Sequence, residues 1–305
     1  MRAAMVALVC VLQQSAFAQS TGGTQPKILN GRLETQAAGS NFAGTFQRLA
    51  GAQTEPAWIG YSVPALTRSN GDGRLCCGGD YWISDGIVIS NGRLATCGLE
   101  PGDRSTRAAE GQPRTTQSPI KLEGPDTMVV LFRVEEKAVQ KVRIFSPDCE
   151  LDAGGRAIHW LEGVAPADSV KLLSSLASGS DRVRGGAMAA LGMHREDVAL
   201  PALLSLAKQD PNAKVRGDAL FWLAETAGRR VVPEITAAID NDPDTDVKKR
   251  AVFALSQLPK DEGVPLLINV AKTNKNPAVR KQAMFWLGQS RDPRALDFFT
   301  QILTK

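Results

Sequence analysis

The sequence is poor in the residues on which most enzyme active sites depend. Its 305 residues include two histidines, His159 and His194, and aromatic residues make up 6% of the chain. Neither histidine has a metal-ligand partner four residues away, and no G-x-S-x-G elbow, phosphate-binding loop or G-x-G-x-x-G fingerprint is present. We therefore expect no catalytic residues, no metal site and no cofactor. A binding protein is favoured over an enzyme, which stays open as the alternative.

The sequence also lacks a strong charge of either sign and a long hydrophobic run. Lys and Arg number 36 against 32 Asp and Glu, a net charge of +4, and the two signs are interspersed. A surface that binds nucleic acid needs a clustered basic field, so no nucleic-acid partner is expected. No apolar run approaches the roughly 20 residues that cross a bilayer, so no membrane span is expected.

The amino terminus has the pattern of a secretory signal peptide. Arg2 supplies positive charge, residues 3–12 form an apolar run, and Ala16-Phe17-Ala18 matches an A-x-A cleavage site. We expect residues 1–18 to be removed, which leaves a mature chain that begins at Gln19. This predicts an exported protein, periplasmic or secreted.

Cysteine is confined to the N-terminal half of the mature chain, at Cys76, Cys77, Cys97 and Cys149. An even number of cysteines in an exported chain predicts two disulfides. A bond between the neighbours Cys76 and Cys77 would close a strained ring, so we expect this pair to be tied to both Cys97 and Cys149. Either of the two pairings satisfies this expectation. The alternative, a metal site, lacks a C-x-x-C pair and histidine ligands.

The C-terminal half is built on a repeated pattern. Each repeat carries a valine, a basic residue directly after it, an alanine four positions later and a leucine eight positions later. The valines recur at a constant spacing of 32, as Val183, Val215, Val247 and Val279. This pattern predicts a helix with one apolar stripe, hereafter a valine helix, and a second apolar helix follows each one. Such a period is typical of stacked helix pairs that share one continuous core.

These repeats resemble HEAT repeats, in the short form shared with bilin-lyase-type proteins. The matching segments are "VRGDALFWLAETAGRRVVPEI" from Val215, "VKKRAVFALSQLPKDEGVPLL" from Val247 and "VRKQAMFWLGQSRDPRALDFF" from Val279. The resemblance covers about residues 155–305, with His159-Trp160-Leu161 matching Phe221-Trp222-Leu223 as a degenerate opening unit. It implies an α-solenoid of about four and a half helix pairs that binds a protein or peptide on its concave face.

The N-terminal half carries strand patterns instead, so the predicted fold class is α+β. We expect a flexible lead-in over 19–56 with one short helix at 42–49, a small β-rich, disulfide-stapled domain over 57–150, and the array over 151–305. Two hairpins are predicted. One joins residues 87–90 to 93–96 across Asn91-Gly92, and the other joins 128–134 to 139–145.

One residue of the valine helix falls outside its apolar stripe. At 100° per residue from Val215, Phe221 lies at roughly 240°, and Phe253 and Phe285 occupy the same position in the next two units. The resemblance places the valine helix on the concave side. The three rings would then form an apolar ladder in a groove, which marks a partner-binding site. The alternative is that the rings pack between neighbouring units.

Three further interpretations concern other residues. The basic residue after each valine (Arg184, Arg216, Lys248, Arg280) is expected to pair with acidic residues of adjacent turns and so to have a structural role. A carbohydrate or small-ligand site over 57–150 is an alternative function, lined by aromatic residues (Trp58, Tyr61, Tyr81, Trp82). A second alternative function is that of a lyase-like enzyme, which the resemblance to the bilin lyases implies.

Overall fold

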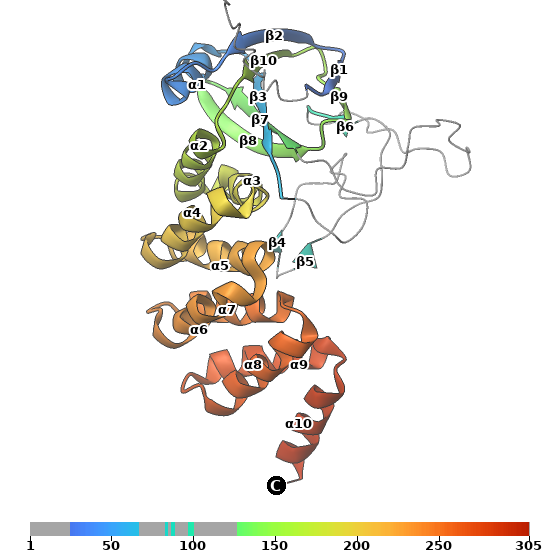
Figure 1. Ribbon diagram of the computed structural model, residues 1–305, viewed down its shortest axis with the longest axis vertical. Helices are drawn as coiled ribbons and strands as arrows, with labels where there is room; N and C mark the ends of the chain where they lie inside the picture. The colour runs from blue at the N-terminus through green and yellow to red at the C-terminus, as the bar shows by residue number, and fades with distance from the viewer. Residues whose placement is uncertain (1–24, 67–82, 85–86, 89–96, 101–126, 305) are drawn as a thin grey trace, which may run out of the picture.

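The computed structural model describes residues 25–66, 83–84, 87–88, 97–100 and 127–304. The three-stranded and five-stranded sheets and one helix form one end of the molecule, and a column of paired helices continues from them (Figure 1). The strands are β1 (Lys27–Leu29), β2 (Arg32–Ala37), β3 (Ala57–Pro64), β4 (Ile83–Ser84), β5 (Ile87–Val88), β6 (Cys97–Gly98), β7 (Thr127–Glu135), β8 (Ala138–Phe145), β9 (Glu150–Asp152) and β10 (Ala157–Glu162). The first helices are α1 (Phe42–Ala52), α2 (Pro166–Ser178), α3 (Asp181–Gly192), α4 (Glu196–Gln209) and α5 (Ala213–Ala227). The 3₁₀ turn η1 (Gly228–Val231) and helices α6 (Val232–Asn241), α7 (Thr245–Gln257), α8 (Lys260–Thr273), α9 (Pro277–Ser290) and α10 (Pro293–Leu303) follow. A C-terminal helical repeat array that follows a sheet-containing region is thus confirmed.

The larger sheet has five strands in the order β2-β10-β3-β7-β8. Strand β7 lies antiparallel to both β3 and β8, whereas β10 lies parallel to β2 and β3. The predicted hairpin at residues 128–145 is confirmed as β7 and β8. Its turn places Glu136 and Lys137 at φ 51° and 62°, a left-handed conformation that suits a tight hairpin turn.

The expected flexible lead-in is wrong from Lys27 onward. The predicted short helix is confirmed as α1, but β1 and β2 belong to sheets, with β2 paired along its whole length to β10. Strand β2 reads Arg-Leu-Glu-Thr-Gln-Ala and is mostly exposed, because it is an edge strand. Its stability comes from backbone hydrogen bonds to β10, which leave no hydrophobic pattern in the sequence to predict it.

The predicted opening repeat at His159-Trp160-Leu161 is also wrong, because these residues lie in β10. Ile158 and Trp160 point to one face of the sheet and Leu161 packs into the core on the other, which is the two-residue alternation of a strand. The first helix of the array is α2, at Pro166. The predicted array boundary at residue 151 is therefore too early, because β9 and β10 belong to the sheets and the helices begin at Pro166.

The predicted hairpin around Asn91-Gly92 lies mostly outside the described residues. Within them, Ile87–Val88 pairs with Ile83–Ser84, as β5 and β4.

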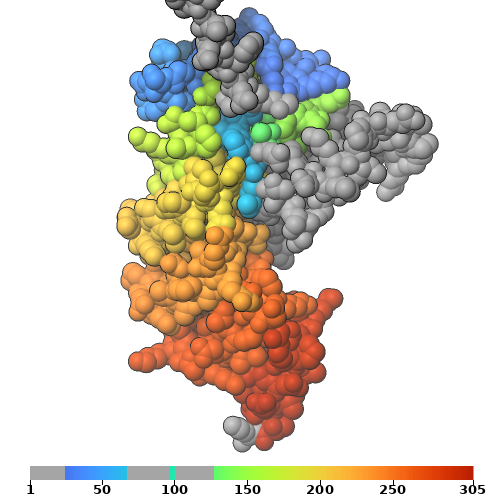
Figure 2. Space-filling view, in the orientation of Figure 1, coloured from blue at the N-terminus to red at the C-terminus, as the bar shows by residue number. Residues whose placement is uncertain are grey.

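The central strands β3 and β7 of the five-stranded sheet are buried on both faces. On one face Trp58, Trp160 and Phe145 pack with residues of the three-stranded sheet β1-β9-β6. On the other face Phe42 of α1 and Tyr61 of β3 join a core that runs without interruption into the helices. Figure 2 shows the sheet end and the helices as one elongated body. The sheet therefore covers the N-terminal end of the array, whose first helices would otherwise expose their apolar faces.

Helix α3 approaches the sheet through a glycine. A Cβ added at Gly186 would lie 2.3 Å from the carbonyl oxygen of Val142 on β8, whereas one added at Gly185 would meet nothing within 4 Å. A Cβ so close to a backbone atom would force the helix and the strand apart. The glycine at 186 thus sets the distance between array and sheet.

We expect Gly186→Ala to destabilise the protein by about 1–3 kcal/mol, the usual cost of overpacking. Gly185→Ala is the matched control. It should stabilise α3 by about 0.5–1 kcal/mol, because alanine is the better helix former and the site is open. Urea unfolding of the two variants checks both signs. Equal effects would show that α3 does not rest on β8 as described.

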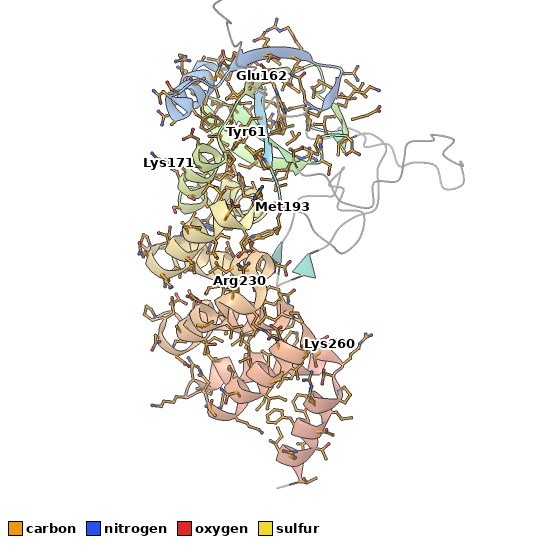
Figure 3. The ribbon with its side chains drawn as sticks, viewed as in Figure 1. Tyr61, Glu162, Lys171, Met193, Arg230 and Lys260 are labelled. Carbon is orange, nitrogen blue, oxygen red and sulfur yellow. The ribbon has the colours of Figure 1, made fainter. Side chains whose placement is uncertain are left out.

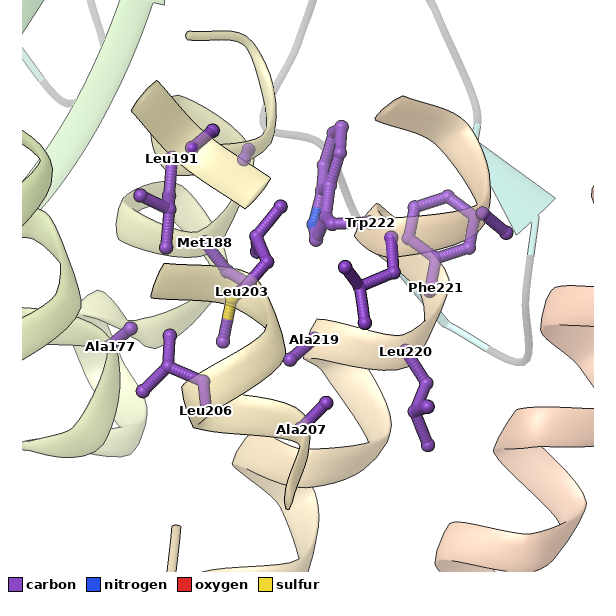
Figure 4. Packing of buried hydrophobic residues seen from close by; sticks show 14 of the residues in the cluster. Ala177, Met188, Leu191, Leu203, Leu206, Ala207, Ala219, Leu220, Phe221 and Trp222 are labelled. Atoms are coloured by element: carbon purple, nitrogen blue, oxygen red, sulfur yellow. The ribbon is translucent and has the colours of Figure 1, made fainter. Parts of the chain in front are cut away.

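The helices of the array pair in a definite order. The valine helices are α3, α5, α7 and α9. Each of the other helices packs most extensively against the valine helix that follows it, which gives the pairs α2/α3, α4/α5, α6/α7 and α8/α9. Helix α10 comes after the last pair. Figure 4 shows buried side chains of α3, α4 and α5 gathered between these helices, with Leu206 of α4 directed toward Ala177 of α2. The valine helices also pack directly on one another, α5 on α7 and α7 on α9.

Each valine helix begins at an N-cap residue three positions before its valine. The caps are Ser180, Asn212, Asp244 and Asn276, and each side chain accepts a hydrogen bond from the backbone N–H two positions later. These side chains satisfy donors that would otherwise have no partner at the helix start. The cap repeats with the same period as the valine and fixes where each helix begins.

Candidate partner-binding surface

The phenylalanines of the predicted ladder form a column with a neighbouring tryptophan. The rings of Phe221 and Phe253 stack with centroids 5.5 Å apart and planes 6° apart. Phe253 lies 4.9 Å from Trp286, and Trp286 lies 4.9 Å from Phe285 in an edge-on arrangement. We call these four residues the aromatic column.

Burial differs sharply along the aromatic column. Phe221 and Phe253 are 4% and 7% exposed, whereas Phe285 is 52% exposed. Because adjacent valine helices pack directly on one another, a residue on the flank of one helix is covered by the next. The prediction of an open ladder is therefore wrong for Phe221 and Phe253, which pack between units. Of the three, Phe285 alone offers an exposed aromatic surface.

Exposed apolar side chains also occur on α10, the helix that follows α9. Among the described residues the large hydrophobic side chains that are exposed are Phe285, Leu296, Ile302 and Leu303, and all lie on α9 or α10. We call this surface the open end of the array. On α10, Ala295 and Phe298 are buried against the preceding units. Helix α10 is thus apolar on two sides, one of them uncovered.

The basic residue after each valine is expected to pair with acidic residues of adjacent turns, and the structure shows this for Arg216, while Arg184 pairs with Asp181 of its own helix. Arg216 of α5 forms two hydrogen bonds of 2.8 and 2.9 Å with Asp242, which follows α6, and another of 2.9 Å with the carbonyl of Asp210. Burial opposes ionisation of Asp242, but the hydrogen bonds from Arg216 and from the backbone N–H of Asp244, together with the positive charges of Arg216 and Lys248, hold its pKa below the ordinary value. Lys248 donates instead to the carbonyl of Asp240 in the last turn of α6, and Arg280 donates to the carbonyls of Asn274 and Lys275 between α8 and α9.

Further ion pairs cross from unit to unit. Asp218 of α5 pairs with Arg250, which holds the same repeat position on α7. Burial raises the pKa of Asp218, although the ion pair acts in the opposite direction. Arg229 and Arg230, in the turn between α5 and α6, reach Glu262 of α8 and Glu196 of α4. The charges of the array's middle therefore serve to hold neighbouring units together.

A cleft of about 450 Å³ lies between α4, α5 and α6. Its charged lining is already paired, Lys208 with Glu234 at 3.7 Å and Arg216 with Asp242 at 2.8 Å. Asp210, also on its wall, accepts a hydrogen bond from Ser178. A charged ligand would have to displace these contacts, so the cleft is a weaker candidate than the open end.

A buried polar chain joins the sheet to the array. The hydroxyl of Tyr61 on β3 lies 2.7 Å from Oγ of Ser169 on α2, which lies 2.9 Å from Nε2 of His194 at the end of α3. Nδ1 of His194 lies 2.8 Å from the carbonyl of Ala190. Figure 3 shows Tyr61 and, beside His194 in sequence, Met193. A carbonyl only accepts, so Nδ1 carries the proton, Nε2 accepts from Ser169, and Ser169 accepts from Tyr61.

Ser169 and His194 lie as a nucleophile and its base would, with the Ala190 carbonyl orienting the imidazole, but the side chains of Tyr61, Ser169 and His194 are fully buried. Burial lowers the pKa of His194 to about 4 and raises that of Tyr61, so both are neutral. The arrangement is a satisfied polar contact in the core and not an accessible catalytic site. No sequence motif could have revealed it, because the three residues come from β3, α2 and the end of α3, which lie far apart along the chain.

The aromatic residues of the alternative ligand site do not come together. Trp58 and Tyr61 are both fully buried, on opposite faces of the sheet, and Trp58 donates a hydrogen bond of 2.8 Å to Glu100. Tyr81 and Trp82 lie outside the described residues. No group of three or more potential metal ligands occurs in the part of the chain that the structure describes.

The family model for HEAT repeats matches residues 145–224 and 232–305, just over half of the chain. The chain belongs to the HEAT-repeat family. No curated protein matches the sequence. In the described segments, no helix is long and apolar enough to cross a membrane.

Two solved structures are similar to part of the chain. The complex of CpcE and CpcF of phycocyanin lyase from Nostoc sp. PCC7120 is 18% identical with a TM-score of 0.35, over 45% of this chain and 89% of that chain. YibA of E. coli is 27% identical with a TM-score of 0.32, over 45% of this chain and 53% of that chain. The match thus spans about half the length of YibA.

Proposed function

We propose that this chain is an exported interaction protein whose HEAT array binds a protein or peptide partner. The observation that carries the proposal is the open end, where Phe285, Leu296, Ile302 and Leu303 expose apolar surface. Large exposed apolar side chains gathered on adjacent helices of an otherwise well-packed protein are typical of an interaction site. Of the three phenylalanines predicted to form the binding site, only Phe285 therefore remains in the proposed surface.

Partner capture tests this proposal. The mature chain, immobilised by its N-terminal end, is exposed to the exported fraction of the source cells and cross-linked. A partner that elutes with wild type but not with Leu303→Asp supports the proposal. Capture that is equal for the two proteins counts against this surface, and no specific capture by either counts against the function.

Export and the disulfides are part of the same proposal. Cys97 and Cys149 are each 1% exposed, neither is a free thiol, and they lie on or beside the paired strands β6 and β9. Cys76 and Cys77 lie outside the described residues, so the pairing stays a prediction. We expect the purified mature chain to begin at Gln19 and to gain the mass of four hydrogens on reduction. A chain that keeps residues 1–18, or that shows no mass change, would contradict this.

A further inference from the structure

We infer that the open end binds an amphipathic α-helix of the valine-helix type, supplied by another polypeptide. This inference rests on the proposed function and names the class of partner. Each residue of the open end has a counterpart one repeat earlier in the array, and the two differ in what covers them.

The exposed residues of α10 occupy positions that are buried one repeat earlier. Leu296, Ile302 and Leu303 are 67%, 42% and 83% exposed. Their counterparts on α8, which are Val264, Val270 and Ala271, are 2%, 7% and 4% exposed. The sequence has kept these positions apolar, although in α10 they face no neighbour among the described residues.

The valine helix that follows is the main packing neighbour of α8. Helix α9 packs along α8 and buries its own Val279, Ala283 and Leu287 in doing so. The same relation holds for α4 with α5 and for α6 with α7. Helix α10 is the next member of this series, and no helix follows it in the described residues. The open end therefore continues an interface that the array builds repeatedly within this chain.

Phe285, on valine helix α9, is likewise exposed where its counterpart one repeat earlier is buried. Its counterpart Phe253 is 7% exposed because Trp286, on the following valine helix, lies 4.9 Å from its ring. Phe285 is 52% exposed and lacks such a cover. Trp286 lies seven positions after the valine of its helix. A helix docked on α9 and α10 in the register of the array would place its own aromatic residue at that position over Phe285.

The repeat thus specifies the chemistry of the occupant. The docked helix should carry valine, alanine and leucine at positions i, i+4 and i+8 with an aromatic residue at i+7, as α5 and α9 do. It would cover the surface formed by Phe285, Leu296, Ile302 and Leu303. The small residue at i+4 allows close approach of the two helices, and the aromatic residue meets Phe285.

A peptide with this chain's own valine-helix sequence is the probe. A labelled, end-capped peptide of residues 213–227 is titrated with the mature full-length chain and followed by fluorescence anisotropy. We expect saturable binding. In the peptide, a change equivalent to Leu223→Asp should abolish binding, because it places a charge on the apolar stripe.

Variants of the open end locate the site. Leu303→Asp should weaken peptide binding at least about tenfold, because burying a leucine contributes more than one tenfold step in affinity. Gln301→Asp is the matched control, since it places the same charge on an exposed position of the same helix and should leave affinity unchanged. Both residues are exposed, so thermal melts of both variants should match wild type.

Other outcomes overturn the inference. Equal binding by Leu303→Asp and wild type, or no binding of the peptide at all, would remove the open end as a helix site. A wild-type dimer that Leu303→Asp converts to monomer would show that a second copy covers this face instead. Either result leaves the proposed function standing if partner capture succeeds, and only failed capture overturns that function.

Discussion

Acidification from pH 7 to pH 4 is expected to remove about 3 kcal/mol of stability through His194 alone, as its pKa difference between the folded and unfolded chain dictates. Burial lowers the pKa of His194 in the folded protein from 6.5 to about 4. Between these values the unfolded chain binds a proton that the folded chain does not, so stability is full above pH 6.5 and declines as the pH falls toward 4. Urea unfolding at several pH values across this window measures the effect.

Two variants separate the histidine from its surroundings. His194→Gln should flatten the pH dependence in this window, whatever its effect at neutral pH, because it removes the titrating group. Ser169→Ala should cost about 1–3 kcal/mol at every pH by leaving Nε2 of His194 and the hydroxyl of Tyr61 without their partner. It should keep the slope, since burial is the main cause of the lowered pKa. An unchanged slope in His194→Gln would assign the pH dependence to other groups.

Acid should act first at the junction of sheet and array. His194 also pairs through its backbone with Ala65, and the N–H of Leu66 donates to the carbonyl of Met193 at 2.8 Å. The end of β3 is therefore attached to the same turn that holds the imidazole. A charged imidazole would carry a proton on Nε2, so the Ser169 hydroxyl could no longer donate to it and would have to turn its own proton away while accepting from both Nε2 and Tyr61. Hydrogen exchange at Leu66 would report this loosening before the array unfolds.

The array could be predicted from the sequence because its repeat is local. Val, Ala and Leu at helical spacing, recurring at one constant period, fix both the helices and their stacking. The N-caps at Ser180, Asn212, Asp244 and Asn276 carry the same period and could have set each helix start. The sheet was predicted less well. Strand β2 is a polar edge strand, and its partner β10 lies far along the chain, so nothing local indicates the pairing.

The aromatic column shows where helical periodicity loses its power. A helical wheel places Phe221 and Phe285 at the same angle, yet their exposures are 4% and 52%. The angle gives the flank of the helix, but burial depends on whether another unit follows. This depends on position in the array, which a single repeat cannot reveal.

Phe253→Ser is accordingly expected to lower stability by about 3–5 kcal/mol, the usual cost of truncating a buried phenylalanine. Phe253 lies between the rings of Phe221 and Trp286, and its removal leaves both without their packing partner. Phe285→Ser is the matched control at the same repeat position, and we expect a change of about 1 kcal/mol or less because the ring is half exposed. Urea unfolding at neutral pH compares the two.

Partner capture should respond in the opposite way, with loss in Phe285→Ser and retention in the fraction of Phe253→Ser that stays folded. If Phe253→Ser melted like wild type, the ring would not be core, and the open groove along the valine helices would have to be considered again.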